Sequence, residues 1–81
     1  MWEVIGFEVI SNSEGAVTGY TMYCTKPFKG ETGKGKLAKR FWYRANIGYK
    51  PNVGDKVFVE VSVRNGSGGK QFEVVDDIIK M

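Results

Sequence analysis

An alternation of valine with other residues constrains the fold of this 81-residue chain more than any other feature. Valine occupies every odd position from Val57 to Val63. The residues between and beside the valines are Lys56, Phe58, Glu60, Ser62 and Arg64. A period of two places the valines on one face of a β-strand and the other side chains on the opposite face. We therefore expect a half-buried strand over 56–64, with a turn at 51–55 before it and a glycine-rich hairpin connection at 65–69 after it.

The remaining segments also favour strands. Valine, isoleucine, threonine and aromatic residues predict strands over 2–10, 16–25 and 70–75, with a turn at 11–15. The pattern assigns no state to 76–81. Segment 37–47 allows two interpretations, because Leu37, Phe41 and Ala45 would share one face of a helix. The consecutive aromatics Phe41-Trp42-Tyr43 favour a strand instead.

Five short strands separated by turns, with no convincing helix, predict an all-β fold. We expect a small five-stranded antiparallel barrel, OB-like or alternatively SH3-like, because closing a barrel removes the exposed edges of a sheet. The length accommodates one domain over 1–81. A long basic β-hairpin loop at 26–36 is expected to be flexible. The aromatic residues assigned to the core are Phe7, Phe41, Tyr43 and Phe72.

The composition excludes several kinds of site. The chain has no histidine and one cysteine, Cys24, which rules out an intrachain disulfide, the usual zinc sites and Ser-His-Asp or Cys-His catalysis. No apolar run approaches the ~18 residues of a spanning helix. The first residues also lack the basic region of a secretion signal. We therefore expect a cytoplasmic protein that is not an enzyme, is not inserted in a membrane and uses no metal or cofactor.

One motif imitates a nucleotide site. Residues 30–37, with the sequence GETGKGKL, match the spacing G-x-x-x-x-G-K of a phosphate-binding loop. Leu37 stands where such a loop needs the serine or threonine that binds Mg²⁺. The chain is also too short for the parallel sheet and helices that such loops join. We interpret the segment as the tip of a basic hairpin.

Positive charge is concentrated in the middle of the chain. The net charge is +3, but 26–44 holds seven bases and one acid, which is a net +6. The bases are Lys26, Lys29, Lys34, Lys36, Lys39, Arg40 and Arg44, and the acid is Glu31. Such a block indicates a surface that binds a polyanion. The alternative is a solvated lysine-rich loop without a ligand.

The strongest candidate site is Arg40, Trp42 and Arg44, which share one face of the expected strand. The indole could stack on a base while the two guanidinium groups bind phosphates. Further candidates are aromatic residues beside bases and the lysines of the basic loop. They are Phe58, Tyr49, Phe28, Lys29, Lys34 and Lys36. For Trp42 the alternatives are that it faces the core or packs against a subunit neighbour.

The layout resembles that of the small helix-destabilising single-stranded DNA-binding proteins of filamentous phages, which are OB-like five-stranded barrels. The similarity lies in an N-terminal strand, a basic and aromatic hairpin wing at 16–47, the approach Tyr49-Lys50-Pro51 and a glycine-tipped hairpin at 56–75. The resemblance implies a homodimer that coats single-stranded DNA cooperatively without reading sequence. It also implies a role in replication of a phage or mobile element in a bacterial cytoplasm. The resemblance further implies a DNA-binding groove in this chain. Its lining would be Arg40, Trp42, Arg44, Tyr49 and the wing-loop lysines.

Two functions therefore remain open. The first is sequence-tolerant binding of single-stranded nucleic acid, with DNA expected rather than RNA. The second is a protein-interaction module of the SH3 or OB type, such as a phage-encoded modulator of a host complex, in which Trp42 and Phe58 would form an apolar patch. A small core also favours a homodimer that buries further apolar surface.

Overall fold

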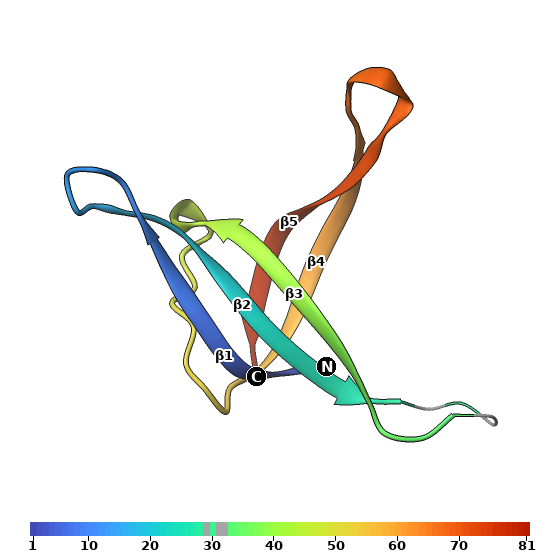
Figure 1. Cartoon of the computed structure of the whole chain (residues 1–81). Helices are drawn as coiled ribbons and strands as arrows, with labels where there is room; N and C mark the ends of the chain where they lie inside the picture. Colours follow the sequence, from blue (N-terminus) through green and yellow to red (C-terminus); the bar gives the residue numbers. More distant parts are fainter. Residues whose placement is uncertain (29, 31–32) are drawn as a thin grey trace.

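The protein is an all-β sheet of five antiparallel strands, as the alternating pattern predicts. The computed structural model describes residues 1–28, 30 and 33–81. The strands are β1 (Trp2–Ser11), β2 (Val17–Pro27), β3 (Lys36–Arg44), β4 (Lys56–Asn65) and β5 (Gln71–Lys80). They form one sheet in the order β3-β2-β1-β4-β5 (Figure 1). Two short 3-10 turns, η1 (Ala45–Ile47) and η2 (Ser67–Gly69), interrupt the connections.

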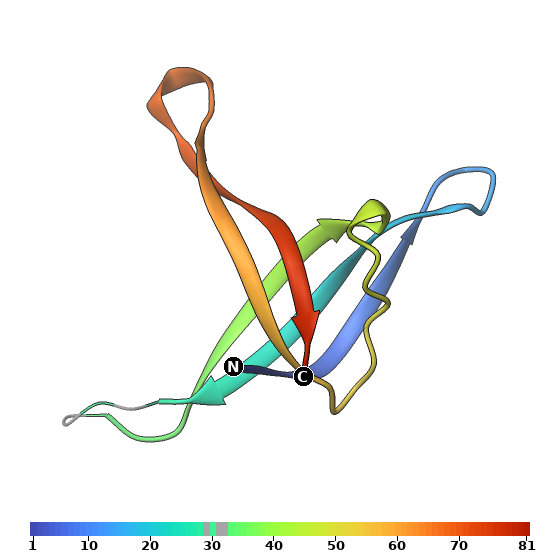
Figure 2. The same ribbon diagram turned by 180° about the vertical axis from the view of Figure 1, so that it is seen from behind.

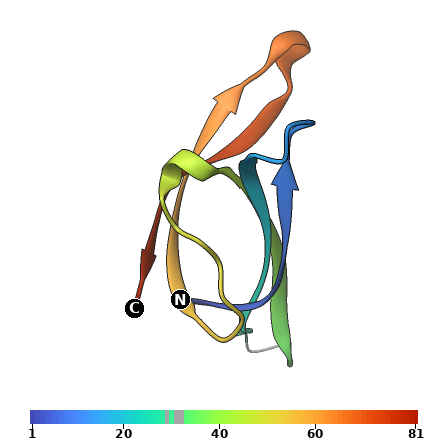
Figure 3. The same cartoon turned by 90° about the vertical axis from the view of Figure 1, so that its left-hand side faces the viewer.

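The sheet is strongly curled and stays open along one seam. Strands β1, β2 and β3 form a meander, and β4 and β5 form a hairpin. Among the described residues, two pairs of strand residues join these parts, Trp2 with Val57 and Glu3 with Lys56. Figure 3 shows the two parts facing one another across the interior. The edge strands β3 and β5 are not neighbours in the hydrogen-bonded sheet, although Nζ of Lys39 lies 2.6 Å from Oε1 of Glu73 across the seam.

The core lies on the concave side of this curl. Its buried residues are Val4, Met22, Cys24, Phe41, Tyr43, Val57 and Ile78. Because directly paired residues share a face, the pairing of Met22 with Phe41 aligns the inner faces of β2 and β3. In β3 the buried Phe41 and Tyr43 flank Trp42, which is 53% exposed. This period of two confirms a strand here, rather than a helix, and places Trp42 outside the core.

Two strand ends differ from the sequence prediction by three residues or more, and the other bounds by at most two. Strand β3 ends at Arg44 and not at residue 47, because the chain turns through η1 and then through Gly48 at a φ of 89°. Left-handed φ values favour glycine, so the turn is fixed at this position. Strand β5 runs on to Lys80 and includes most of the unassigned 76–81 segment. It continues because Ile78 pairs with Val59 and is buried against the core.

Two residues assigned to the core are exposed, which corrects that prediction. Phe7 is 37% exposed, although it pairs with the buried Met22. Phe72 is 51% exposed and pairs with Arg64. Phe72 lies on the outer face, because Arg64 is on the side of β4 opposite the valines. Phe7 lies on the inner face, but the β4–β5 hairpin leaves the meander beyond the two-pair ladder, as Figure 2 shows. The inner side chains of β1 and β4 beyond that point therefore lack a covering layer.

The same divergence limits the valine face of β4. Val57 is fully buried and Val59 packs against the core, but Val61 is 40% and Val63 is 63% exposed. All four share one strand face, since β4 has no extra residue between them. The valine face of β4 thus continues through Val61 and Val63, beyond the part that the core covers.

The connection from η1 to β4 is fastened to β1. The N–H of Val4 donates to the carbonyl of Asp55 (2.9 Å), and the N–H of Gly54 donates to the carbonyl of Val4 (2.8 Å). Pro51 is buried within this connection. Over the described residues, no helix has the length and apolar character needed to cross a membrane.

Met22 provides a test of this core. Its side chain is fully buried, so Met22→Ala removes packed apolar atoms and leaves a cavity. We expect a loss of about 2–5 kcal/mol in the free energy of unfolding, measured by urea denaturation. Val53→Ala is the control, because Val53 is 65% exposed and its truncation should change stability by under about 0.5 kcal/mol. Equal effects of the two changes would contradict the core described here.

Candidate nucleic-acid interface

The outer face of β3 presents the three residues that the sequence singled out. Arg40, Trp42 and Arg44 alternate with the buried Phe41 and Tyr43, so they project together to the convex side of the sheet. Successive side chains on one strand face are about 7 Å apart, which places the indole between the two guanidinium groups. The face prediction for these three residues therefore agrees with the structure.

The neighbours of Trp42 on β2 leave its ring accessible. Across the ladder Trp42 pairs with Thr21 and Arg44 pairs with Gly19. A Cβ at position 19 would lie 2.7 Å from the carbonyl oxygen of Tyr43, so only glycine fits there without a shift of the backbone. No side chain therefore stands beside Arg44 on β2, and the space around the indole remains open to a planar ligand.

Neither arginine of this face forms an ion pair within the described residues. Two ion pairs occur there, Lys39 with Glu73 and Lys80 with Asp55, and neither includes Arg40 or Arg44. Glu8 accepts a hydrogen bond from the hydroxyl of Tyr23 (2.8 Å), and this bond raises the pKa of Tyr23. Arg40 pairs with Tyr23 across the ladder, and its charge and hydrogen bonding lower the pKa of Tyr23 against the larger effect of Glu8. Arg44 is in neither ion pair and is exposed to an external anion.

A hollow of about 360 Å³ adjoins the indole at the seam between β3 and β5. Trp42 and Arg44 line it on one side, and Phe72 and Val74 line it on the other. Phe72 was missed as a surface residue, because the sequence did not show the hairpin register that pairs it with Arg64 on the outer face. The exposed rings of Trp42 and Phe72 make this hollow suited to a flat apolar group such as a base.

The structure separates Tyr49 and Phe58 from this face. Tyr49 is half-buried, its ring centroid lies 6.4 Å from that of Tyr43, and its hydroxyl donates to Oδ2 of Asp55 (2.7 Å). The hydroxyl of Tyr43 in turn donates to the carbonyl of Tyr49 (3.0 Å). These contacts hold the connection to β4 in place. Phe58 is 45% exposed on the outer face of β4, opposite Ile79, in the other part of the sheet.

The basic loop is largely a continuation of the β2–β3 hairpin. The N–H of Phe28 donates to the carbonyl of Gly35 (3.0 Å), and Gly30 forms a bridge with Gly33. Side chains at these two glycines would overlap the Phe28 ring. Lys34 and Lys36 are exposed, whereas the candidate Lys29 lies outside the described residues. The apparent phosphate loop leads at Leu37 into a strand rather than a helix.

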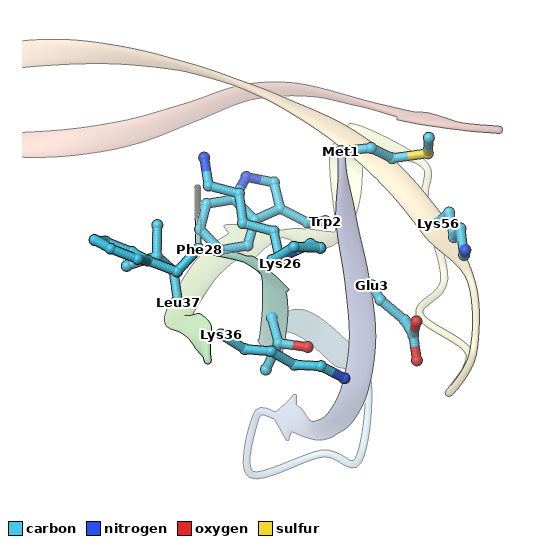
Figure 4. A pocket seen from close by; sticks show the side chains of 10 residues that line it. Met1, Trp2, Glu3, Lys26, Phe28, Lys36, Leu37 and Lys56 are labelled. Carbon is cyan, nitrogen blue, oxygen red and sulfur yellow. The ribbon is translucent and has the colours of Figure 1, made fainter. Parts of the chain in front are cut away.

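Phe28 and Lys36 line a second and larger depression, at the end of the sheet where the hairpin starts. Its volume is about 710 Å³, and its wall includes Trp2, Lys26 and Lys56 (Figure 4). Sequence reasoning did not assign these last three to the site. Their strand positions gave no sign that the ends of four strands meet here.

Cys24 is buried, and the described acidic residues form no metal-binding cluster. Burial raises the pKa of the Cys24 thiol to about 11, so it stays protonated near neutral pH. Among the residues whose positions are described, no group of three or more Cys, Asp or Glu side chains is arranged to hold a metal ion.

The structural role of Tyr49 predicts a pH-dependent effect. Burial, with the hydrogen bond to Asp55, raises the pKa of Tyr49 from 10.0 to about 12. The stabilisation is therefore present below pH 10 and is lost as the pH rises toward 12. Tyr49→Phe removes the hydroxyl, and should lower the free energy of unfolding by about 1–2 kcal/mol at neutral pH. In urea denaturation at a series of pH values, this difference should shrink in the alkaline range.

Tyr20→Phe is the matched control, because Tyr20 is half-buried and its hydroxyl donates no hydrogen bond within the described part of the chain. A Tyr49→Phe protein as stable as the wild type at neutral pH would contradict the assigned contact.

Comparison of the chain with protein-family models, with curated proteins and with solved structures finds no match.

Proposed function

We propose that this protein binds single-stranded nucleic acid, DNA in particular, without reading its sequence. The observation that carries the proposal is the exposed indole of Trp42 between the guanidinium groups of Arg40 and Arg44, on one face of β3. Bases of a single strand are free to stack on an aromatic ring, and the flanking phosphates can bind the guanidinium groups. We propose DNA rather than RNA because the layout of the chain resembles that of the phage single-stranded DNA-binding proteins.

The residues around the indole favour binding that does not depend on the nucleotide sequence of the strand. Every base has a flat face, so stacking on Trp42 does not distinguish one base from another. The nearest partners on β2 are Thr21 and Gly19, and neither presents the paired donor and acceptor of an Asn or Gln side chain. Arg40 and Arg44 would contact phosphates, which are the same at every position. A protein with this face would coat a strand rather than select a site.

We further propose a homodimer, because the inner face beyond the core is uncovered. Val61 and Val63 continue the stripe of Val57 but are 40% and 63% exposed. Phe7 and Val9 on β1 are also exposed, although their partners on β2 lie on the inner face. A second copy that packs on these side chains would bury apolar surface at about 25 cal/mol per Å². A partner protein of another kind on the same surface is the competing outcome.

Trp42→Ala tests the binding function. We expect it to weaken binding of an oligothymidylate by about 1–3 kcal/mol, because one stacking contact is lost. Fluorescence anisotropy of a labelled oligonucleotide measures this, with single-stranded DNA, single-stranded RNA and duplex DNA compared at two salt concentrations. Binding of the wild type should favour single-stranded DNA and weaken as salt rises.

Val53→Ala is the control, since Val53 is exposed in the connection before β4, and its loss should not change binding. Circular dichroism of Trp42→Ala should match that of the wild type. No binding by the wild type, or equal binding by Trp42→Ala, would refute the proposal and favour the protein-interaction module.

Val63→Lys tests the homodimer. Val63 is 63% exposed on the face that the proposed dimer buries, so a charge there should shift the protein to monomer in sedimentation velocity. Val53→Lys is the matched control, because Val53 has a nearly equal exposure of 65% but lies in the connection before β4. A wild-type protein that sediments as a monomer at high concentration would overturn the dimer.

A further inference from the structure

The depression at the open end of the sheet has the size and composition of a nucleotide site. Its volume of about 710 Å³ lies in the range of small-molecule pockets, about 300–1,000 Å³. It is formed where the starts of β1, β3 and β4 meet the end of β2. Figure 4 shows Lys26 lying across the Trp2 indole, with Phe28 and Leu37 to one side and Lys56 to the other.

The Trp2 ring is held in place and keeps a face toward this depression. It packs against the ring of the buried Phe41 in a T-shaped arrangement, with ring centroids 5.3 Å apart and planes at 79°. The ammonium of Lys26 lies 4.5 Å from the centroid of the indole. A cation that covers an aromatic face in this way can be replaced by a base, which offers the ring a larger contact. The released ammonium could then bind the phosphate attached to that base.

The charge of the depression favours a phosphate. Three ammonium groups, those of Lys26, Lys36 and Lys56, line it with one carboxylate, Glu3. Neither ion pair found among the described residues uses any of these three lysines. A net positive wall beside two aromatic rings, Trp2 and Phe28, suits a group that is both flat and anionic.

The depression is continuous with the face that carries Trp42. Lys36 is the first residue of β3 and lies on the same outer face as Arg40 and Arg44. Glu3 and Thr25 also reach the wall from this outer face. Ala38 lies on the outer face of β3, Thr25 pairs with Ala38, and Glu3 pairs with Thr25. Trp2 and Leu37 come from the inner face. A strand that follows β3 for about 20 Å from Trp42 would arrive at the depression.

We infer that this depression, with Trp2, Phe28, Lys26, Lys36 and Lys56 in its wall, is a second nucleotide subsite. It takes one nucleotide of the strand bound along β3, with the base on Trp2 and the phosphate at Lys26. The inference rests on the proposed function. It adds a contact that a ligand reaches only when it is long enough to pass from Trp42 to the end of the strand.

The two tryptophans allow the two sites to be tested separately, because the chain has no others. Trp42→Phe leaves Trp2 as the reporter, and Trp2→Phe leaves Trp42. Each variant is titrated with a thymidine dinucleotide and with an oligothymidylate of about 16 nucleotides. Anisotropy of the labelled long oligonucleotide records binding independently.

We expect the long oligonucleotide to quench both reporters, and the dinucleotide to leave Trp2 unchanged at concentrations that quench Trp42. A silent Trp2 in a protein that binds the long strand would overturn the subsite while the proposed function stands. Silence of both reporters, with no binding by anisotropy, would overturn the proposed function itself.

A lysine substitution keeps the test decisive if Trp2→Phe or Trp42→Phe fails to fold. Lys26→Gln should lower the affinity for the long strand severalfold and reduce the slope of log affinity against log salt by about 0.7, the value for one phosphate of a single strand. Lys70→Gln is the control, because Lys70 is exposed at the tip of the β4–β5 hairpin. Equal salt slopes for the two variants would refute the phosphate contact.

Discussion

The two-pair ladder between β1 and β4 is the constraint on which the rest of the structure depends. It is the place where the meander and the hairpin share backbone hydrogen bonds, through Trp2 with Val57 and Glu3 with Lys56. The fully buried Val4 and Val57 lie at this junction. Burial decreases away from it along both β1 and β4, because the strands diverge. The junction therefore fixes how much of each apolar stripe becomes core and how much is left for another molecule.

The curl that follows from this junction places the core side chains of β3 on one face and its candidate binding residues on the other. The concave face of β3 supplies Phe41 and Tyr43 to the core, and the convex face holds Trp42 between two arginines. A strand accomplishes this with alternating residues, since its two faces have independent neighbours. Changes on the convex face are thus expected to alter the proposed binding with little effect on the free energy of unfolding. The connection through Tyr49 and Asp55 fastens β4 to this arrangement from the inside.

The sequence predicted the features that depend on the local alternation of residues, namely the strands and their faces. It missed the features that depend on how distant strands are placed in the folded sheet. The valine alternation identified β4. The aromatic run identified β3, and the alternation within it assigned its inner and outer faces correctly. Phe72 and Phe7 were assigned to the core because large aromatics in a small protein usually lie there. The exposure of Phe7 follows from the divergence of β4 from β1, and that of Phe72 from the hairpin register that pairs it with Arg64 on the outer face. No local pattern records either one. Trp2 and Lys56 belong to different strands whose ends meet only in the folded sheet, so the second depression had no local signal.

The two edges of the sheet carry opposite charge, and this has a consequence for aggregation. Strand β3 has four basic residues and no acidic one, whereas β5 has three acidic residues and one basic one. Unpaired strand edges tend to add strands from other molecules. Here two β3 edges repel each other, and two β5 edges do the same. The favourable combination of β3 with β5 is met within one chain, across the seam at Lys39 and Glu73. An open barrel of this kind can remain dispersed without closing its last row of hydrogen bonds.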